Sequence, residues 1–454
     1  MISEKKATRS QKKGAREILR LGLKALAYRR DVLPAEEVEV LEKTSQALKD
    51  SLDAKPVLGD ELEEKAMEVD EALRKSGGHY YHKKGWVENV EMLLVAAIVV
   101  IGIRSFFVQP FIIPTNSMYP SFYGMQPYVY DDDDSVPNLA QRAVDKILLG
   151  ASHYSFKAER SGSLYLLDVK QVASSFPNGR FFVFPTTLNE YVFEIGGKEH
   201  SLQVPVEFDL QELLARKFGG IENLDDIRKI IPPDRNGMLK LSERIYKEGE
   251  VVLAFDVLLG DALFVDRFTY NFIKPKSGDP AVFRTGTIDE FNKKLNTRVT
   301  TLIGEDKYYI KRLVGEPGDK LEMQVPPDVF TNGTDVVKGV PGILFRNDEP
   351  IKGKIAFEQN RLRTESLAID PRAENKRGFP GYRAEGLLRN RSELQVPTKN
   401  SPDNPTKQNA YFAMGDNSTD SLDGRAWGFV PEKEIIGRAL FIYYPFTKRW
   451  GIPD

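Results

Sequence analysis

The sequence has no cysteine and only four histidines among its 454 residues. The lack of cysteine excludes disulfides, thiolate nucleophiles and cysteine metal sites. An excess of one charge is also missing: 64 Lys and Arg residues stand against 66 Asp and Glu residues, a net charge of −2. Charge therefore gives no reason to expect a nucleic-acid partner. No catalytic pattern surrounds the histidines, which makes a Ser/His/Asp triad a poor interpretation; they are His79, His82, His153 and His200.

Long apolar runs are scarce as well, and the one strongly apolar run is Trp86 to Val108, WVENVEMLLVAAIVVIGIRSFFV. Its uncharged centre, Met92 to Ile103, has about 12 residues, a length that a buried helix of a soluble protein would also have. If the charged side chains at both ends reach the interfaces, about 20 residues are available to cross roughly 30 Å of hydrocarbon. We therefore predict a single transmembrane anchor at 86–108, with a buried soluble helix as the alternative.

Basic residues around this run predict its orientation. Residues 105–124 contain no Lys or Arg, whereas five basic residues lie within about 20 positions before the run: Lys65, Arg74, Lys75, Lys83 and Lys84. Positive charge favours the cytoplasmic side, so the N-terminus is expected in the cytoplasm and the rest of the chain on the extracytoplasmic side. A cleaved signal peptide fits less well, because about 85 residues precede the run and no A-x-A pattern follows it.

The segments before and after the apolar run differ in their residue pattern. Residues 1–85 are charged and helix-prone, and PAEEVEVLEKTSQALKDSL and DELEEKAMEVDEALRKSGG indicate a solvated helical hairpin, with a dedicated partner-binding module as the alternative. After the run, short β-type stretches such as AVFRTG and AYFAMGDN alternate with Gly, Pro and Asp, which favours an antiparallel β domain. The acidic run Asp131 to Asp134 is interpreted as a solvated loop rather than a cation site.

One serine, Ser117, lies in the stretch FIIPTNSMYPSFYG just after the apolar run. A serine hydroxyl needs a positioned base to become a nucleophile, and with no suitable histidine a lysine is the remaining candidate. Lysine acts as a base only when neutral, a state that burial favours. In YYIKRLVGEPGD, Lys311 lies within an apolar, strand-like run. Strand alternation places Lys311 and Arg312 on opposite faces, so that one can be buried while the other stays solvated.

A third stretch, MGDNSTDSLDGRAWGFVP, is a Gly-bounded polar loop between two apolar strands. Together with VVIGIRSFFVQPFIIPTNSMYPSF, LLGDALFVDRFTY with PKSGDPAVFR, and YYIKRLVGEPGDKLE, it resembles the type I signal peptidases, or leader peptidases. These are membrane-anchored serine proteases with a Ser/Lys dyad, and the blocks occur here in the family order. The resemblance implies that the chain removes signal peptides from exported preproteins by acyl-enzyme hydrolysis, without a metal or other cofactor.

The resemblance also implies roles for individual residues. Ser117 matches the nucleophile and Lys311 the general base. Thr115 matches a hydroxyl residue that binds the oxyanion together with the Ser117 backbone N–H. Ser421 matches the hydroxyl that orients the lysine amine.

Further matched positions have supporting roles. Asp423 and Arg425 match an ion pair near the active site, whose alternative is an ordinary loop salt bridge. Asp416 and Asn417 are expected to hold the shape of the loop. Three residues are expected to contact substrate: Pro114, Met118 and Tyr309. Met118 is also expected to serve as a packing residue of the nucleophile motif.

The predicted fold is mainly β, with a single transmembrane helix, an antiparallel β catalytic domain and a large α+β insertion. The predicted segments are a cytoplasmic helical region at 1–85, the anchor at 86–108, a nucleophile loop at 109–124, an inserted lobe at 125–255, a catalytic core at 256–315, an accessory β region at 316–410 and a closing block at 411–454. In the family the nucleophile block runs almost directly into the LLGD-type block, whereas here about 130 residues intervene. The resemblance implies nothing about this insertion.

The expected partners are exported preproteins, the lipid bilayer and the secretion translocase, in a bacterial inner membrane. Two interpretations from other classes stay open at this point. One is a soluble Ser/Lys autoprotease of the repressor type, and the other is a membrane-tethered binding protein that kept the fold without activity. A further alternative is an insertion that narrows the substrate range to a few exported proteins.

Overall fold

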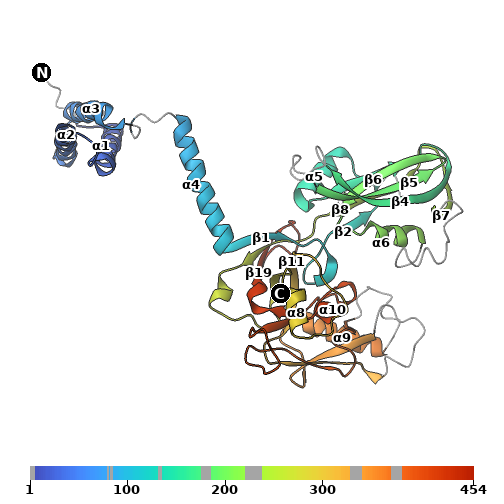
Figure 1. Cartoon of the computed structure of the whole chain (residues 1–454). Helices are drawn as coiled ribbons and strands as arrows, with labels where there is room; N and C mark the ends of the chain where they lie inside the picture. Colours follow the sequence, from blue (N-terminus) through green and yellow to red (C-terminus); the bar gives the residue numbers. More distant parts are fainter. Residues whose placement is uncertain are drawn as a thin grey trace. The chain divides into compact units, whose positions relative to one another are not determined.

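The computed structural model describes residues 6–78, 81, 85–130, 135–174, 186–219, 238–327, 340–369 and 381–453. The chain divides into two compact units, Met1–Ile101 and Gly102–Asp454 (Figure 1). His79, His82 and the acidic run at 131–134 lie outside the described residues.

The first unit is built around three helices: α1 (Arg9–Arg29), α2 (Ala35–Asp53) and α3 (Gly59–Ser76). Their apolar faces form a shared core that includes Leu41, Leu48 and Val69. The predicted hairpin of two helices was therefore incomplete, because α1 packs against both. The fully buried positions of α1 are the small residues Ala15, Gly22 and Ala25, and Ile18, Leu19 and Leu26 pack against the same core.

The apolar run forms α4 (Gly85–Phe106). Within it, Asn89–Phe106 has a mean hydropathy of 1.9, and none of this stretch is buried in the structure. Eighteen helical residues extend about 27 Å, close to the thickness of a hydrocarbon core. Among the described residues, this is the one helix that is long and apolar enough to cross a membrane.

A seven-stranded antiparallel sheet forms the centre of the second unit. In spatial order its strands are β1 (Val108–Ile112), β9 (Ala262–Asp266), β19 (Ile435–Tyr444), β10 (Pro280–Arg284), β11 (Tyr308–Gly315), β17 (Ala410–Met414) and β18 (Val430–Pro431). Only Phe107 separates α4 from β1. The sheet therefore begins at the C-terminal end of the apolar helix.

A smaller antiparallel sheet follows β11. Its strands are β12 (Lys320–Gln324), β13 (Val340–Arg346), β14 (Glu349–Pro350), β15 (Tyr382–Ala384) and β16 (Glu393–Gln395). Its core is continuous with the central sheet, because Leu321 and Leu344 share a buried cluster with Phe412 of β17. Helix α9 (Ile355–Ile369) contacts β13 and β15.

The segment between β1 and β9 contains two further antiparallel sheets with a common core. The first sheet is β2 (Gln126–Val129), β8 (Val251–Leu258) and β3 (Ser152–Lys157), and the second is β6 (Lys198–Pro205), β5 (Thr186–Ile195), β4 (Gly162–Ser174) and β7 (Leu239–Tyr246). In the described part of this segment two α-helices accompany them, α5 (Leu139–Leu149) and α6 (Leu210–Leu214). We call this segment, 125–258, the inserted lobe.

The prediction of a mainly β fold is confirmed in a coarser form. All pairs of named strands are antiparallel, and β-sheet dominates the described part of the second unit. With the three-helix unit and α4 included, the chain as a whole is mixed α and β.

The core of the first unit generates a prediction. Leu48 is fully buried, whereas Leu23 is 51% exposed. We expect Leu48→Ala to destabilise the unit by about 2–5 kcal/mol, because it leaves a cavity, and Leu23→Ala to have little effect. Hydrogen exchange of residues 9–76 in the full chain measures this. Equal protection in both variants would contradict the three-helix core.

Candidate active site

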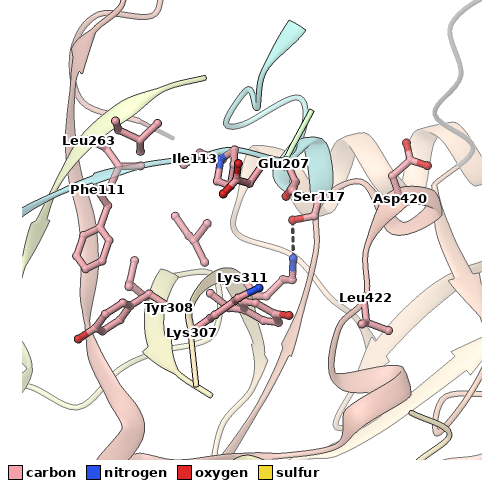
Figure 2. Close-up of a pocket in the computed structure, with 16 residues that line it drawn as sticks. Phe111, Ile113, Ser117, Glu207, Leu263, Lys307, Tyr308, Lys311, Asp420 and Leu422 are labelled. Atoms are coloured by element: carbon pink, nitrogen blue, oxygen red, sulfur yellow. Dashed lines mark hydrogen bonds between the residues drawn. The ribbon is translucent and has the colours of Figure 1, made fainter. Parts of the chain in front are cut away.

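The structure brings Ser117 and Lys311 together although 194 positions separate them in the chain. Ser117 lies in the short 3₁₀ turn η2 (Asn116–Met118), and Lys311 lies in β11. Lys311 Nζ donates a hydrogen bond to Ser117 Oγ over 2.5 Å (Figure 2). Both residues are buried, with 6% and 5% of their surfaces exposed. The predicted nucleophile and the predicted base are thus in direct contact inside the protein.

Apolar packing fixes the turn that presents Ser117. Met118 and Phe122 are fully buried, in a cluster with Val265 of β9 and Val282 of β10. The backbone N–H of Ile113 donates to the carbonyl of Asp261, which ties the entry of the turn to the start of β9. Met118 was expected to contact substrate, but its side chain lies in this core and does not line the adjacent cavity. Its position fits the packing role.

Burial changes the acidity of Lys311. Desolvation of the ammonium is the largest effect and lowers the pKa of Lys311 from 10.5 to about 8. Asp423 opposes this shift, while Arg425 adds to it. At pH 7 roughly one lysine in ten is then neutral, compared with fewer than one in a thousand at the ordinary value. The site therefore makes a neutral amine available near physiological pH.

The neighbour of Lys311 has an ion pair that the sequence did not suggest. Arg312 and Asp416 are both fully buried, and Arg312 Nε and Nη2 each lie 2.7 Å from an Asp416 carboxylate oxygen. The prediction that one of Lys311 and Arg312 stays solvated was wrong. Alternation does point them to opposite faces, but Asp416 compensates for the burial of Arg312. Burial lowers the pKa of Arg312, and the Asp416 carboxylate outweighs this and raises it.

Arg312 also connects the loops around the site. It donates to the carbonyl of Gly278 over 2.7 Å and to Ser121 Oγ, just beyond the nucleophile turn, over 3.1 Å. Asp416 was expected to hold the shape of its loop. The structure shows that it does so through Arg312, which joins that loop to β11 and to the chain after Ser117.

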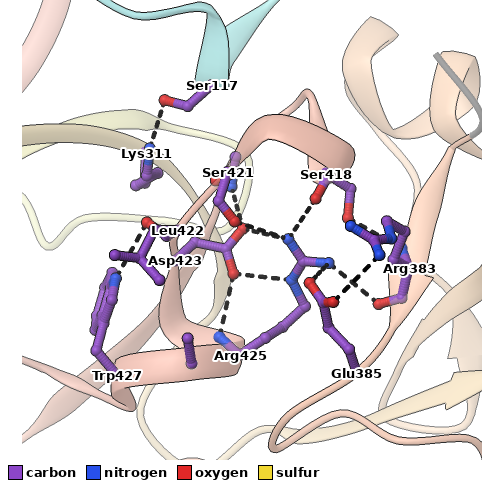
Figure 3. A network of polar contacts seen from close by, with 12 residues as sticks. Ser117, Lys311, Arg383, Glu385, Ser418, Ser421, Leu422, Asp423, Arg425 and Trp427 are labelled. Carbon is purple, nitrogen blue, oxygen red and sulfur yellow. Dashed lines mark hydrogen bonds and ion pairs between the residues drawn. The ribbon is translucent and has the colours of Figure 1, made fainter. Parts of the chain in front are cut away.

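A second ion pair, Asp423 with Arg425, lies in the loop beyond Ser421 (Figure 3). Arg425 Nε and Nη2 each lie 2.8 Å from a carboxylate oxygen of Asp423, and both side chains are at most 1% exposed. An ordinary exposed loop salt bridge is therefore excluded. Burial raises the pKa of Asp423, but Arg425 outweighs this and keeps it below its usual value. Glu385 also pairs with Arg425, over 2.8 Å, and was missed in the sequence because no local motif marks it.

Ser421 does not make its expected contact. Its Oγ is buried, and the structure gives it no hydrogen-bond partner among the described residues. It lies close to Gly415 and to the Ser117 carbonyl, because a Cβ on Gly415 would collide with both groups. Its predicted role in orienting the Lys311 amine thus stays a prediction.

Asn417 holds the nucleophile turn from the side of the closing loop. Its backbone N–H donates to the carbonyl of Ser117 over 3.1 Å, and its side-chain amide donates to the carbonyl of Asn116 over 3.2 Å. The expected role in shaping the loop therefore extends to Ser117 itself. Thr115 is exposed beside the nucleophile, at the edge of the cavity described next.

A cavity of about 390 Å³ opens beside Ser117 and Lys311. The segments 111–117 and 307–311, at the end of β1 and the start of β11, contribute most of its lining. Besides Ser117 and Lys311 the lining comprises Phe111, Ile112, Ile113, Pro114, Thr115, Leu263, Val282, Lys307, Tyr308, Tyr309, Ile310, Asp420, Leu422 and Glu207. Pro114 and Tyr309, expected to contact substrate, are among these residues. Glu207 is an exposed residue of the inserted lobe, so this lobe reaches the cavity.

Other polar clusters were considered as alternatives. In the inserted lobe, His153 Nδ1 lies 2.7 Å from Asp256 Oδ1, and the further partner of that carboxylate is the hydroxyl of Tyr130 rather than a serine. Within the described part of the chain, no group of three or more His, Asp or Glu residues is placed to hold a metal ion.

The profile of the family described as signal peptidase, peptidase S26, matches residues 254–444. Signal peptidase I of Buchnera aphidicola subsp. Acyrthosiphon pisum is 29% identical over 221 residues, which cover 42% of this chain and 65% of that protein. Signal peptidase I of Haemophilus influenzae is 30% identical over 218 residues, covering 42% and 60%. Residues 254–444 therefore match the signal peptidase family.

The resemblance seen in the sequence is thereby confirmed. The chain spans about two thirds of the length of the curated relatives it matches. A crystal structure of a signal peptidase I from Enterococcus faecalis is 18% identical and covers 37% of this chain and 97% of that one, with a TM-score of 0.20, which supports no conclusion. The signal peptidase match includes Lys311, Asp423 and Arg425 but begins after Ser117, whose assignment rests on its contact with Lys311.

The buried amine generates a prediction about stability. Because the pKa of Lys311 is lowered in the folded state, the cost of burying its charge is present in full below pH 8 and is relieved as the pH rises toward 10.5. The difference between these values corresponds to about 3 kcal/mol. We expect Lys311→Met to melt at a higher temperature than wild type at pH 6, with a gap that narrows above pH 8.

Thermal unfolding of the detergent-solubilised chain between pH 6 and 10 measures this. Lys307→Met is the matched control, because Lys307 lies just before β11, is exposed and pairs with Glu305. A Lys311→Met protein that melts below wild type at pH 6 would argue against a destabilising buried amine.

Proposed function

We propose that the chain is a membrane-anchored signal peptidase I that removes signal peptides from exported preproteins with a Ser117/Lys311 dyad. The observation that carries the proposal is the 2.5 Å contact between Lys311 Nζ and Ser117 Oγ in a buried site. The family match of residues 254–444 supports the reaction class.

The proposed chemistry follows from the two groups. Neutral Lys311 accepts the Ser117 hydroxyl proton while Oγ attacks the carbonyl carbon of the scissile bond. The backbone N–H of Ser117 and the hydroxyl of Thr115 stabilise the oxyanion. When the tetrahedral intermediate collapses, the Lys311 ammonium returns its proton to the leaving amine, and an ester on Ser117 remains. Lys311 then accepts a proton from water, which attacks the ester, and the Lys311 ammonium returns that proton to Ser117 Oγ as the product acid leaves.

The cavity suits an extended peptide. Strand β1 is an edge strand of the central sheet, and β11 pairs with β17 only from Arg312 onward. The backbones of Phe111–Pro114 and Tyr308–Lys311 therefore flank the cavity with edges to which a peptide strand can add. The resemblance to signal peptidases implies that small uncharged side chains bind next to the scissile bond.

The proposed location joins the site to the bilayer. We take α4 as a single anchor, with the N-terminus in the cytoplasm and the catalytic domain outside the bacterial inner membrane. Ser117 lies only about ten residues beyond the anchor, and Pro110 and Pro114 stiffen this connector. A signal peptide presents its cleavage site just outside the bilayer, so a short connector sets the nucleophile at the required depth. Delivery of preproteins by the secretion translocase belongs to the same proposal.

Cleavage of a preprotein with an A-x-A site tests the dyad. We expect wild type to cleave at the predicted bond. Ser117→Ala and Lys311→Met should each lose at least 10²–10⁴-fold in kcat/KM, the range of a general base. Lys307→Met removes a lysine from the same cavity and should cleave normally.

The outcomes separate the competing interpretations. Equal cleavage by all four proteins would rule out the dyad. A folded wild type that binds the preprotein without cutting it would favour a tethered binding protein. Recovery of the wild type in the soluble fraction would favour a soluble autoprotease.

The pKa of Lys311 predicts the pH dependence of this reaction. Because the neutral amine is the reactive form, kcat/KM should rise about tenfold per pH unit below pH 8 and level off above it. A soluble peptide substrate assayed between pH 6 and 10 measures the profile. A rate that is flat across this range, or one that rises only near 10.5, would contradict the lowered pKa.

A further inference from the structure

Helix α5 of the inserted lobe presents its apolar side to solvent. Its apolar residues Leu139, Val144, Ile147 and Leu148 are 82%, 52%, 70% and 45% exposed, and no residue of the helix is buried. Surface helices ordinarily do the reverse and bury their apolar stripe against the protein.

Two of the charged residues of α5 are less exposed than these apolar ones. Arg142 and Asp145 are only half-exposed, and Arg142 Nε donates to the carbonyl of Pro137 over 2.8 Å. The helix is well formed, with Asn138 and Gln141 in a capping box and Gly150 in the left-handed conformation at its end. The exposure of the apolar side of α5 is therefore a feature of a regular, capped helix.

The exposed side of α5 continues onto the C-terminal segment. Phe446 N–H donates to the carbonyl of Leu148 over 3.1 Å, and Tyr444 Oη donates to the carbonyl of Ile147 over 3.0 Å. Phe446, Trp450 and Ile452 are 59%, 54% and 83% exposed. We call the exposed apolar residues of α5 and of this segment the α5 surface: Leu139, Val144, Ile147, Leu148, Phe446, Trp450 and Ile452.

The strand connections keep this surface close to the end of the apolar helix. Phe107 alone separates α4 from β1, and the five residues of β1 extend only about 17 Å. Ile112 at the end of β1 pairs with Ala262 of β9, which pairs with Tyr444 of β19. Two strand spacings add about 10 Å. The α5 surface therefore starts within about 30 Å of the point where the chain leaves α4.

The chemistry of the surface fits a lipid interface. Exposed Trp and Phe are typical of the boundary between headgroups and acyl chains. Exposed Lys146 and Lys448 border the apolar residues, and lysines at this depth meet anionic headgroups. The short distance between the α5 surface and the end of α4 favours lipid as the occupant, because a second copy of the chain or a soluble partner could bind a surface far from the membrane.

We propose that the α5 surface lies in the interface of the bilayer, as a second membrane contact supplied by the inserted lobe together with the C-terminal segment. The occupant is lipid with anionic headgroups. This inference rests on the membrane anchoring in the proposed function. It also assigns the insertion a structural role, because with α4 and α5 both held by the bilayer, the lobe and the cavity beside Ser117 keep a fixed tilt toward the membrane surface.

The absence of cysteine allows a direct test, because one introduced cysteine is the only thiol in the chain. Full chains with Ile147→Cys, Val95→Cys or Lys170→Cys are labelled with an environment-sensitive fluorophore and reconstituted in vesicles of phosphatidylcholine and phosphatidylglycerol. Lipids with spin labels at shallow or deep positions then quench the fluorophores. Val95 lies in α4 and reports the anchor, and Lys170 lies on β4 and is the aqueous control.

The expected result is quenching at 147 by shallow labels, at a depth of about 5–10 Å, with none at 170. Quenching at 95 but not at 147 overturns the inference and leaves the anchor intact. Quenching at 147 but not at 95 supports the α5 contact and overturns the anchor. A signal at 147 that depends on protein density rather than on the spin-labelled lipid identifies a second copy as the occupant and overturns the inference.

Discussion

The arrangement of the site depends on the burial of the Lys311 amine against the Ser117 hydroxyl, which removes the amine from water at a cost in folding free energy. An ammonium taken from water is stabilised best by a carboxylate in contact, but a carboxylate there would hold the proton on the lysine. The structure instead gives Lys311 Nζ the oxygen of Ser117 as its hydrogen-bond partner. The amine is thus left in a state from which a proton is easily lost, and the surrounding fold has to compensate for the lost solvation.

The compensation comes from two buried ion pairs. Asp416 and Asp423 both favour the charged lysine from a distance, and each is neutralised by its own arginine. Buried pairs of this kind contribute little net stability, but removing one partner leaves an unpaired charge and is strongly destabilising. Arg312 and Arg425 therefore act as geometric ties: they join β11, the nucleophile turn and the closing loop. Ser117 and Lys311 keep their relative positions because these segments are connected by hydrogen bonds of two buried arginines, and breaking either ion pair would leave an unpaired buried charge.

The sequence was sufficient to predict that Ser117 and Lys311 meet and that Asp423 pairs with Arg425, because these residues lie in contiguous blocks with family-specific spacing, whereas their catalytic roles stay predictions. It was not sufficient for Arg312, whose burial depends on Asp416 in a loop 104 positions away. Glu385 lacks any local motif, and its role arises only where the smaller sheet meets the closing loop. The orientation of α5 could not be predicted either. An amphipathic pattern indicates that a helix has an apolar and a polar side, but it does not indicate which side faces the protein.

The pairing of the lobe's own ends has a consequence for the order of folding. Gln126 at the start of the inserted lobe pairs with Leu258 at its end, in the antiparallel strands β2 and β8. When the lobe folds, the pairing of its two ends brings β1 and β9 side by side, although Ile112 and Ala262 are far apart in the chain. Interactions inside the lobe then offset the entropy lost in closing so long a loop, and the catalytic sheet does not have to offset it. In the proposed dyad Ser117 precedes Lys311 by 194 positions, so on a growing chain the proposed site cannot form until the lobe and β11 have both been made.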